Sequence, residues 1–248
     1  YDETSGIPYV GTDDWEIGRL AAEHLLALGL TNFAFCGYPK DRLNVWASNR
    51  AEGFRQRLVQ EGYDCDIYEG YRQLSQKWDL RQEELAKWLD PLPKPLGLMG
   101  CYDSRARHVL EACRFLGLRV PDDVAVIGVD NNELTCELSE PPLSSVEQGA
   151  FRIGYNAAML LDQTMAGIPP AQLHSIVGPV GVVARQSTNL FNVAREVGTA
   201  LRRIREHACL GLQADALAGE LHRGSIDHHS IRCVRPGRRQ FGPHEVGQ

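Results

Sequence analysis

Short apolar runs alternate along the chain with segments in which apolar residues recur every three or four positions. Residues 96–99 and 124–129 are two such runs, with the length and aliphatic content of buried parallel strands. The segment between them has helical periodicity, with apolar residues at Ala106, Val109, Leu110, Cys113 and Leu116. Asp103 or Ser104 can cap this helix, and Gly117 can end it in the left-handed conformation. A strand, a helix and a strand of this size require a parallel crossover, so the pattern predicts an α/β fold.

The same alternation continues on both sides of this unit. Before it, residues 7–10 have the pattern of a strand, Asp13 is the expected cap of a helix, and residues 33–36 form another apolar run. After it, the pattern predicts a helix over residues 150–165 and a short strand over residues 175–177. The chain therefore holds more strands and helices than a single crossover unit.

Polar side chains follow both central strands, at the edge where open parallel sheets bind ligands. Tyr102 and Asp103 come after the first strand, and Asp130 and Asn131 come directly after the second. A carboxylate at Asp130 can accept hydrogen bonds from two hydroxyl groups, and Asp-Asn-Asn is equally a common turn sequence. Asp103 can either bind such hydroxyl groups or cap the helix that follows it. This edge suits a site that grips a polyhydroxylated ligand without transforming it.

Seven short sequence motifs stand in a fixed order along the chain. They are Thr12-Asp13-Asp14, Gly18-x-x-Ala21-Ala22-x-His24-Leu25-Leu26-x-x-Gly29, Arg50-x-x-Gly53-Phe54, Arg105-Ala106-Arg107-His108, Val126-Ile127-Gly128-Val129-Asp130-Asn131, Leu143-Ser144-Ser145-Val146 and Arg185-Gln186-Ser187-Thr188. Each motif is weak alone, but their order and spacing over roughly residues 7–220 are specific. Together they resemble the effector-binding domain of the lactose and galactose repressor family, and within it the xylose operon regulators.

The resemblance implies a two-lobed, periplasmic-binding-protein-like α/β fold with parallel sheets, whose first lobe is incomplete in this chain. Residues 1–190 would form the sugar-binding domain. Residues 1–37 and 146–180 would belong to the first lobe, and residues 38–145 to the second. Two lobes joined by several chain crossings form a hinge that closes on a ligand.

The resemblance also implies ligand contacts. In related repressors the arginine that matches Arg50 reaches ligand hydroxyl groups; here it shares a helix face with Phe54, and a solvated arginine is the alternative. Tyr102 stands where many sugar repressors have an amide, which leaves the preferred sugar open. Trp46 and Trp15 can stack on the apolar face of a pyranose or belong to the core.

Composition narrows the class of protein further. A chain of 248 residues with 43% hydrophobic content can bury one or two α/β cores, and a net charge of -6 argues against a general polyanion-binding surface. The seven cysteines include no Cys-x-x-Cys pair, as expected for reduced thiols in the cytoplasm. No apolar run approaches the length of a membrane span, so no membrane partner is expected.

The carboxyl-terminal part has a different character. Residues 191–223 resemble part of an arabinose-regulator-type DNA-binding domain, with the first short helix of a helix-turn-helix over residues 213–221. A recognition helix should follow, but residues 224–248 hold prolines, glycines and arginines without a sustained period. They are predicted to be either an aberrant, out-of-frame tail or an ordinary disordered basic tail. The chain should therefore attract duplex DNA weakly and without operator specificity.

Two functional hypotheses follow from the resemblance. The first is a sugar-responsive transcription regulator whose effector is a pentose such as xylose, with operator DNA as the partner of the intact family member and a homodimer as one assembly. The second is a sugar-binding protein of the transport type, which shares the fold and lacks a DNA-binding module. The sequence continues with a helix and the beginning of a helix-turn-helix after Thr188, which favours the regulator.

Metal and catalytic chemistry find little support. His228, His229 and Cys233 are spaced loosely like metal ligands, but they have no second pair. Asp13 and Asp14 follow a strand, but no nucleophile elbow, phosphate-binding loop or paired base accompanies them. We therefore expect neither an enzyme nor a resident cofactor or metal.

Overall fold

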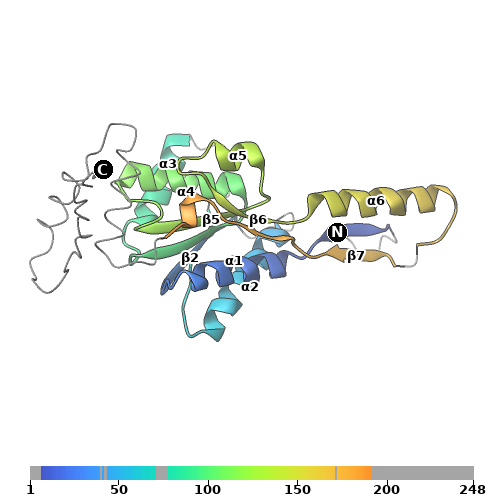
Figure 1. Ribbon diagram of the computed structural model, residues 1–248, viewed down its shortest axis with the longest axis horizontal. Helices are drawn as coiled ribbons and strands as arrows, with labels where there is room; N and C mark the ends of the chain where they lie inside the picture. The colour runs from blue at the N-terminus through green and yellow to red at the C-terminus, as the bar shows by residue number, and fades with distance from the viewer. Residues whose placement is uncertain (1–6, 40, 42–43, 71–77, 171, 191–248) are drawn as a thin grey trace, which may run out of the picture. The chain divides into compact units, whose positions relative to one another are not determined.

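The predicted strands lie side by side in a six-stranded sheet in the computed structural model, which describes residues 7–39, 41, 44–70, 78–170 and 172–190 (Figure 1). In spatial order the strands are β3 (Asp66–Tyr68), β2 (Asn32–Cys36), β4 (Leu96–Gly100), β5 (Val124–Val129), β6 (Ser144–Glu147) and β8 (Gly181–Val183). Neighbouring strands run parallel, except that β8 pairs antiparallel with β6. The predicted α/β fold and the parallel pairing of β4 with β5 are confirmed.

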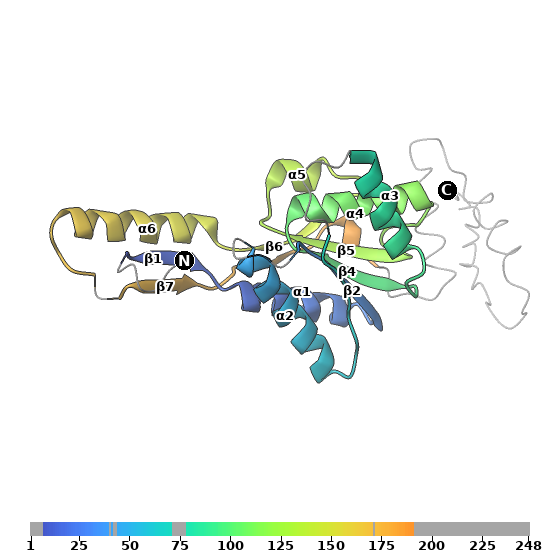
Figure 2. The ribbon, with the colours of Figure 1, turned by 180° about the vertical axis from the view of Figure 1, so that it is seen from behind.

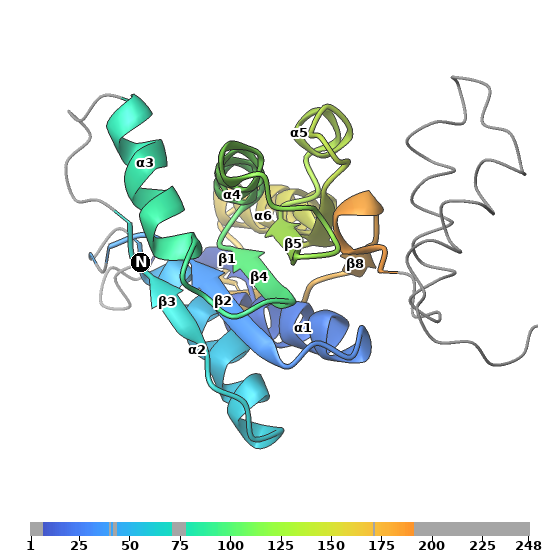
Figure 3. The same ribbon diagram turned by 90° about the vertical axis from the view of Figure 1, so that its left-hand side faces the viewer.

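Helices cover both faces of this sheet, as Figure 3 shows. One face carries α1 (Asp14–Ala27) and α2 (Val45–Gln60), and the other carries α3 (Trp78–Leu89) and α4 (Asp103–Leu116). Strand residues alternate between the two cores: Ile127 packs with α1 and α2, whereas Val126 packs with α3 and α4. Because the central strands are buried on both sides, they appear in the sequence as continuous apolar runs.

Helix ends follow the sequence at some positions and depart from it at others. Asp13 caps α1 as predicted, since its carboxylate accepts a hydrogen bond from the Glu16 amide at 2.9 Å. Gly117 ends α4 in the left-handed conformation, with φ of 68°, also as predicted. The cap of α4 is Tyr102, without a side-chain hydrogen bond, so neither Asp103 nor Ser104 caps this helix.

A second, smaller sheet holds two parallel strands, β1 (Tyr9–Thr12) and β7 (His174–Val177). The helix α6 (Ala150–Met165) contacts β1, and Figure 2 shows it alongside these strands. None of the residues of α6 is buried, and large apolar side chains such as Phe151 and Met165 are 83% and 79% exposed. This sheet therefore has little core of its own.

The boundary between the two sheets differs from the one predicted at residue 37. Helix α1 and strand β2 were expected in the first lobe, but both belong to the six-stranded sheet. The reason is the apolar face of α1: Ile17 and Leu25 are completely buried in the core that also contains Phe35. The chain thus crosses from the small sheet to the large one between β1 and α1. Strand β6, at the start of the predicted return over residues 146–180, also lies in the large sheet.

The chain crosses between the two sheets three times, after β1, after β6 and after β7. These crossings are joined to one another by backbone hydrogen bonds. The Asp13 amide donates to the Val177 carbonyl at 3.2 Å, and the Val180 amide donates to the Glu147 carbonyl at 2.7 Å. A change in the angle between the sheets must therefore be absorbed by these crossings together.

The chain divides into two compact units, Tyr1–Leu190 and Phe191–Gln248. The second unit lies outside the described residues. The predicted partial DNA-binding domain at 191–223 and the predicted tail at 224–248 therefore lie outside the described residues. The same holds for His228, His229 and Cys233, which were considered as metal ligands. Among the described helices, none combines the length and the apolar composition that a membrane span needs.

Candidate functional site

The carboxyl ends of β4, β5 and β6 bring several of the predicted site residues to one edge of the large sheet. Tyr102 follows β4, and Asp130 and Asn131 follow β5. Gln148 follows β6, and Arg50 reaches the same edge from α2. The parallel direction of these strands is what gathers side chains that are far apart in the sequence.

Arg50 lies at the centre of this arrangement and is only 5% exposed. Its Nε donates to Asp14 Oδ1 at 2.9 Å, its Nη1 to the Cys101 carbonyl at 2.7 Å, and its Nη2 to Gln148 Oε1 at 3.3 Å. The predicted helix face is confirmed, because Arg50 and Phe54 are both buried on α2. Removing one partner of a buried ion pair costs about 3–5 kcal/mol of the free energy of unfolding. We therefore expect these contacts to fix the position of the Arg50 guanidinium.

Asp130 faces Arg50 with an unusual backbone, since its φ is 110°. Its Oδ1 accepts a hydrogen bond from Gln148 Nε2 at 2.7 Å and lies 3.8 Å from Arg50 Nη1. The side chain remains 35% exposed, so a ligand can reach it. Burial raises the pKa of Asp130 to about 6, and the nearby Asp103 and Asp14 carboxylates raise it further while Arg50 opposes the shift. We call Asp14, Arg50, Asp130 and Gln148 the Arg50 network.

Asn131 also has a positive φ, of 53°. Its amide donates to Ser145 Oγ at 2.9 Å, and its side-chain oxygen accepts from Arg185 Nη2 at 3.0 Å. These contacts tie the loop after β5 to β6 and to the segment after β8. Asn131 therefore lies beside the Arg50 network with its side chain already bonded to other parts of the chain.

Asp103 is buried, with 2% exposure. Its carboxylate accepts hydrogen bonds from Ser145 Oγ at 2.6 Å, from the Asn132 amide at 2.8 Å and from Cys136 Sγ at 3.4 Å. Burial raises the pKa of Asp103, and these donors oppose the shift. The structure thus gives Asp103 a supporting position, in which it holds the start of α5 (Glu133–Glu137) against β6.

Aromatic rings stand next to the Arg50 network. The guanidinium carbon of Arg50 lies 4.8 Å from the centre of the Trp46 ring, and Trp46 contacts Tyr102 edge to face at 6.2 Å between ring centres. Tyr102 also stacks on Tyr38, a residue that sequence reasoning did not select. Trp15 is 37% exposed and has no ring contact with these residues among the described aromatic pairs.

Two members of the Arg50 network were missed by sequence reasoning. Asp14 was considered only for acid and base chemistry; in the structure it is the ion-pair partner of Arg50, and burial raises its pKa while Arg50 opposes the shift. Gln148 belongs to no motif, but it directly follows the carboxyl end of β6. The rule that selected Asp130 at the end of β5 applies equally to Gln148.

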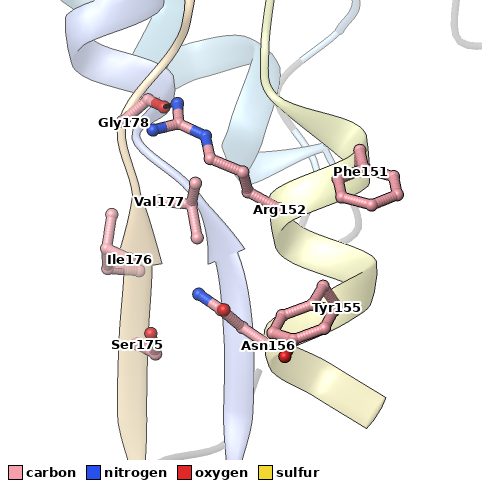
Figure 4. Close-up of a pocket in the computed structure, with 8 residues that line it drawn as sticks. All are labelled: Phe151, Arg152, Tyr155, Asn156, Ser175, Ile176, Val177 and Gly178. Atoms are coloured by element: carbon pink, nitrogen blue, oxygen red, sulfur yellow. Dashed lines mark hydrogen bonds between the residues drawn. The ribbon is translucent and has the colours of Figure 1, made fainter. Parts of the chain in front are cut away.

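One surface hollow lies elsewhere, between α6 and β7 (Figure 4). It has a volume of about 330 Å³ and is lined by Phe151, Arg152, Tyr155 and Asn156 of α6 and by residues 175–178. Arg152 donates to the Gly178 carbonyl at 2.6 Å across one end of it. None of the predicted site residues lines this hollow. Within the described residues, no group of three or more His, Cys, Asp or Glu side chains is placed to hold a metal ion.

Comparison with known proteins agrees with the fold and with the resemblance. The chain is 38% identical over 210 residues to the xylose operon regulatory protein of Escherichia coli (strain K12), a match that covers 84% of this chain and 54% of that protein. It is 36% identical over 203 residues to the xylose operon regulatory protein of Haemophilus influenzae (strain ATCC 51907 / DSM 11121 / KW20 / Rd), covering 82% of this chain and 52% of that protein. The predicted similarity to xylose operon regulators is confirmed.

A solved structure supports the same relation. The structure of the xylose-binding transcription activator xylR matches with a TM-score of 0.74 and 37% identity, covering 87% of this chain and 57% of that one. The chain spans about half the length of the curated relatives it matches. The family described as periplasmic binding protein-like domain matches residues 22–188. This range includes the crossings after β6 and after β7. It also includes Arg50, Asp130 and Gln148 of the Arg50 network. The chain therefore belongs to the periplasmic-binding-protein-like domain family.

Proposed function

We propose that residues 7–190 form the effector-binding portion of a sugar-responsive transcription regulator, and that a pentose such as xylose binds at the carboxyl edge of the large sheet. The observation that carries this proposal is the Arg50 network. It links the Arg50 guanidinium to the Gln148 amide by a hydrogen bond and the Gln148 amide to the Asp130 carboxylate by another, and it leaves that carboxylate 3.8 Å from the guanidinium at the ends of β5 and β6. Such a set can both donate to and accept from hydroxyl groups.

The chemistry of the network fits a neutral, hydroxylated ligand. The Asp130 carboxylate can accept hydrogen bonds from sugar hydroxyl groups, and the N–H groups of Arg50 and Gln148 can donate to the hydroxyl oxygens. The ring of Trp46, over which the Arg50 guanidinium lies at 4.8 Å, adds aromatic surface next to this set. The polar groups of this set match the donors and acceptors of hydroxyl groups, and we propose that they bind the ligand without converting it.

The position of the network suggests how binding could be transmitted. Asp14 lies just after the crossing that leaves β1, and Gln148 lies on the crossing that leaves β6. A ligand that bonds to Arg50 or Asp130 therefore competes with, or reinforces, contacts to two of the three crossings. Closure of two lobes about such crossings is an established way to couple ligand binding to a change of shape.

The relatives support the choice of ligand and of readout. Those compared above are xylose operon regulatory proteins and a xylose-binding transcription activator. By this likeness we propose that operator DNA is the second partner of the whole regulator, contacted through the residues that follow Leu190.

A sugar titration tests the proposal. The intrinsic tryptophan fluorescence of the chain should change saturably with xylose, because Trp46 lies directly on Arg50. Arabinose, ribose and glucose serve as comparison ligands, and we expect a pentose to bind most tightly. Arg50→Lys should weaken the response, whereas Arg55→Lys, at a side chain that is 42% exposed on the same helix, should not. A strongest response to a purine or an amino acid would contradict the proposal.

A further inference from the structure

A cluster of three aromatic rings, Tyr38, Trp46 and Tyr102, lies between the Arg50 network and Arg105 at the start of α4. The guanidinium carbon of Arg105 lies 4.5 Å from the centre of the Tyr38 ring. Tyr38 stacks on Tyr102 at 5.6 Å between ring centres, with planes inclined by 22°, and both rings contact Trp46 edge to face. Arg50 contacts a different ring of this cluster, since its guanidinium carbon lies over Trp46. Two cations thus flank three aromatic rings.

Arg105 has no carboxylate partner within the described residues. Its Nε is buried and makes no hydrogen bond there, so the guanidinium is held mainly by the Tyr38 ring and by packing under Gly70. A partly buried cation without a carboxylate partner can be stabilised by an aromatic face. Within the described residues, the contact with the Tyr38 ring is therefore the main interaction of this guanidinium.

The two phenol groups bond to each other and can still make further hydrogen bonds. The hydroxyl oxygens of Tyr38 and Tyr102 are 2.6 Å apart, and within the described part of the chain neither has another hydrogen-bond partner. Of their two hydrogen atoms, the mutual bond uses one. The other hydrogen and the remaining lone pairs are free, so the pair can donate one hydrogen bond and accept another. Burial raises the pKa of Tyr102, which keeps this phenol protonated and able to donate.

We propose that the Tyr38–Tyr102 pair, held in place by Arg105, is a specificity element of the sugar site that bonds to one ligand hydroxyl group. This inference rests on the proposed function and extends it to three residues. Tyr102 follows β4 beside Cys101, whose carbonyl binds Arg50, so the pair stands at the same edge as Asp130. Arg105 acts through Tyr38 and is a positioning residue. A hydroxyl group matches a pair that offers both a donor and an acceptor, whereas a carboxylate or phosphate would use only the donor.

The first test combines isosteric variants with altered ligands. Tyr102→Phe and Tyr38→Phe should each weaken xylose binding by about 3- to 10-fold, the usual effect of losing one neutral hydrogen bond. Deoxy analogues of xylose, each of which lacks one hydroxyl group, are then bound to the unaltered chain. Only the analogue that lacks the hydroxyl group contacted by the tyrosine pair should show the same loss of affinity. For that analogue Tyr102→Phe should cause no additional loss. Tyr63→Phe is the matched control, because the Tyr63 ring packs on Phe33 away from this edge.

The second test concerns Arg105. Arg105→Met should weaken xylose binding as much as Tyr38→Phe does, and Arg105→Lys should restore part of the affinity because it keeps a cation over the ring. Arg107→Met, at a 50% exposed side chain of the same helix, is the control. Circular dichroism and thermal unfolding show whether each variant folds. If Arg105→Met does not fold, Tyr38→Phe and Tyr102→Phe decide whether the tyrosine pair belongs to the site.

The outcomes separate this inference from the function on which it rests. If the unaltered chain binds xylose and Tyr102→Phe binds it equally well, the tyrosine pair is not part of the site and the inference is overturned. Tighter binding of an anionic sugar such as xylonate than of xylose would also overturn it. If the unaltered chain binds no pentose, the proposed function fails, and this inference fails with it.

Discussion

At the scale of single residues, Asp130 shows how a site residue combines a useful position with an unfavourable environment. Its backbone has a φ of 110°, a conformation that side-chain-bearing residues rarely adopt. Burial raises the pKa of its carboxyl group to about 6, although Arg50 is 3.8 Å away. Residues with strained backbones and shifted pKa values occur preferentially at functional sites. The energetic cost at Asp130 is consistent with selection for binding rather than for stability.

The shifted pKa of Asp130 leads to a testable pH dependence. Only the ionised carboxylate is a strong acceptor for sugar hydroxyl groups, so xylose affinity should rise as the pH passes through about 6 from below. Asp130→Asn should cost about 1.5–3 kcal/mol of binding free energy at neutral pH, as expected for a lost charged hydrogen bond. Isothermal titration calorimetry between about pH 5 and about pH 7.5 measures both effects. If the pH dependence survives in Asp130→Asn, another group causes it.

The sequence allowed some of these residues to be predicted and not others. Asp130 follows an apolar strand directly, so the rule of strand ends was enough to place it at the edge of the sheet. The burial of Asp103 could not be foreseen, because its partners Asn132, Cys136 and Ser145 come from two other segments of the chain. Gln148 was missed because the predicted boundary between residues 145 and 146 divided β6 (Ser144–Glu147) between the two lobes. Such errors concern long-range contacts, which local pattern does not specify.

At the scale of elements, two glycines let α1 and α2 approach closely beneath the Arg50 network. A Cβ atom added to Gly18 would lie 2.1 Å from the Arg50 carbonyl oxygen, and one added to Gly53 would lie 2.0 Å from the Trp15 carbonyl oxygen. Both obstacles are backbone atoms, which cannot rotate away. Each helix thus supplies a glycine where the other helix passes, and one of these contacts is at Arg50 itself.

Gly18→Ala should therefore push α2 away from α1 and displace Arg50. We expect a loss of about 1–3 kcal/mol in the free energy of unfolding, typical of overpacking, together with loss of xylose binding. Gly154→Ala is a matched control in α6, where an added Cβ meets nothing within 4 Å. That control should gain roughly 0.5–1 kcal/mol, because alanine favours the helix over glycine. Urea unfolding measures both; a stable Gly18→Ala variant with normal affinity would contradict the explanation.

His24 connects α1 to the segment that leads toward residue 191. Its Nε2 lies 2.8 Å from the Thr188 hydroxyl oxygen, and that hydroxyl group is also 2.7 Å from Ser144 Oγ. Burial lowers the pKa of His24 below its ordinary value of 6.5. The folded chain therefore takes up a proton here less readily than the unfolded chain does, so stability is complete above the ordinary pKa and falls at lower pH.

His24 should lower the melting temperature as the pH falls below about 6.5, whereas the raised pKa of Asp130 acts in the opposite sense, so we expect His24→Gln to melt increasingly above the unaltered chain as the pH is lowered. Thermal unfolding at a series of pH values measures it. His174→Gln, at an exposed position in β7, should keep the same dependence as the unaltered chain. An unchanged pH profile in His24→Gln would show that acid destabilisation has another origin.

The elements themselves were predicted more accurately than their grouping into sheets. Apolar runs and helical periodicity are local properties, and β4, α4 and β5 follow from them directly. The sheet that a strand joins is not a local property. Strand β2 follows β1 along the chain but pairs with β3 and β4, because the buried face of α1 carries the chain across to the large sheet.

At the scale of the whole described unit, the two sheets differ sharply in how much they bury. The six-stranded sheet has helices on both faces, and every residue of β4 and β5 is buried. The small sheet has two strands and is accompanied by one helix, α6. Among the described residues of these three elements, Val177 in β7 is the only buried hydrophobic residue. A two-stranded sheet is marginal without additional packing, and exposed apolar side chains on α6 contribute little to its stability.

Hydrogen exchange should therefore reveal two levels of protection. The amides of β4 and β5 should exchange only through global unfolding, whereas those of β1, β7 and α6 should exchange much faster through local opening. Mass spectrometry of peptides from these elements measures the difference under native conditions. Added xylose should slow exchange more strongly around Asp14, next to one crossing, and Gln148, on another, than at the far end of α6. Equal protection of β7 and β5 in the free chain would mean that another part of the chain, or a second copy, covers the small sheet in solution.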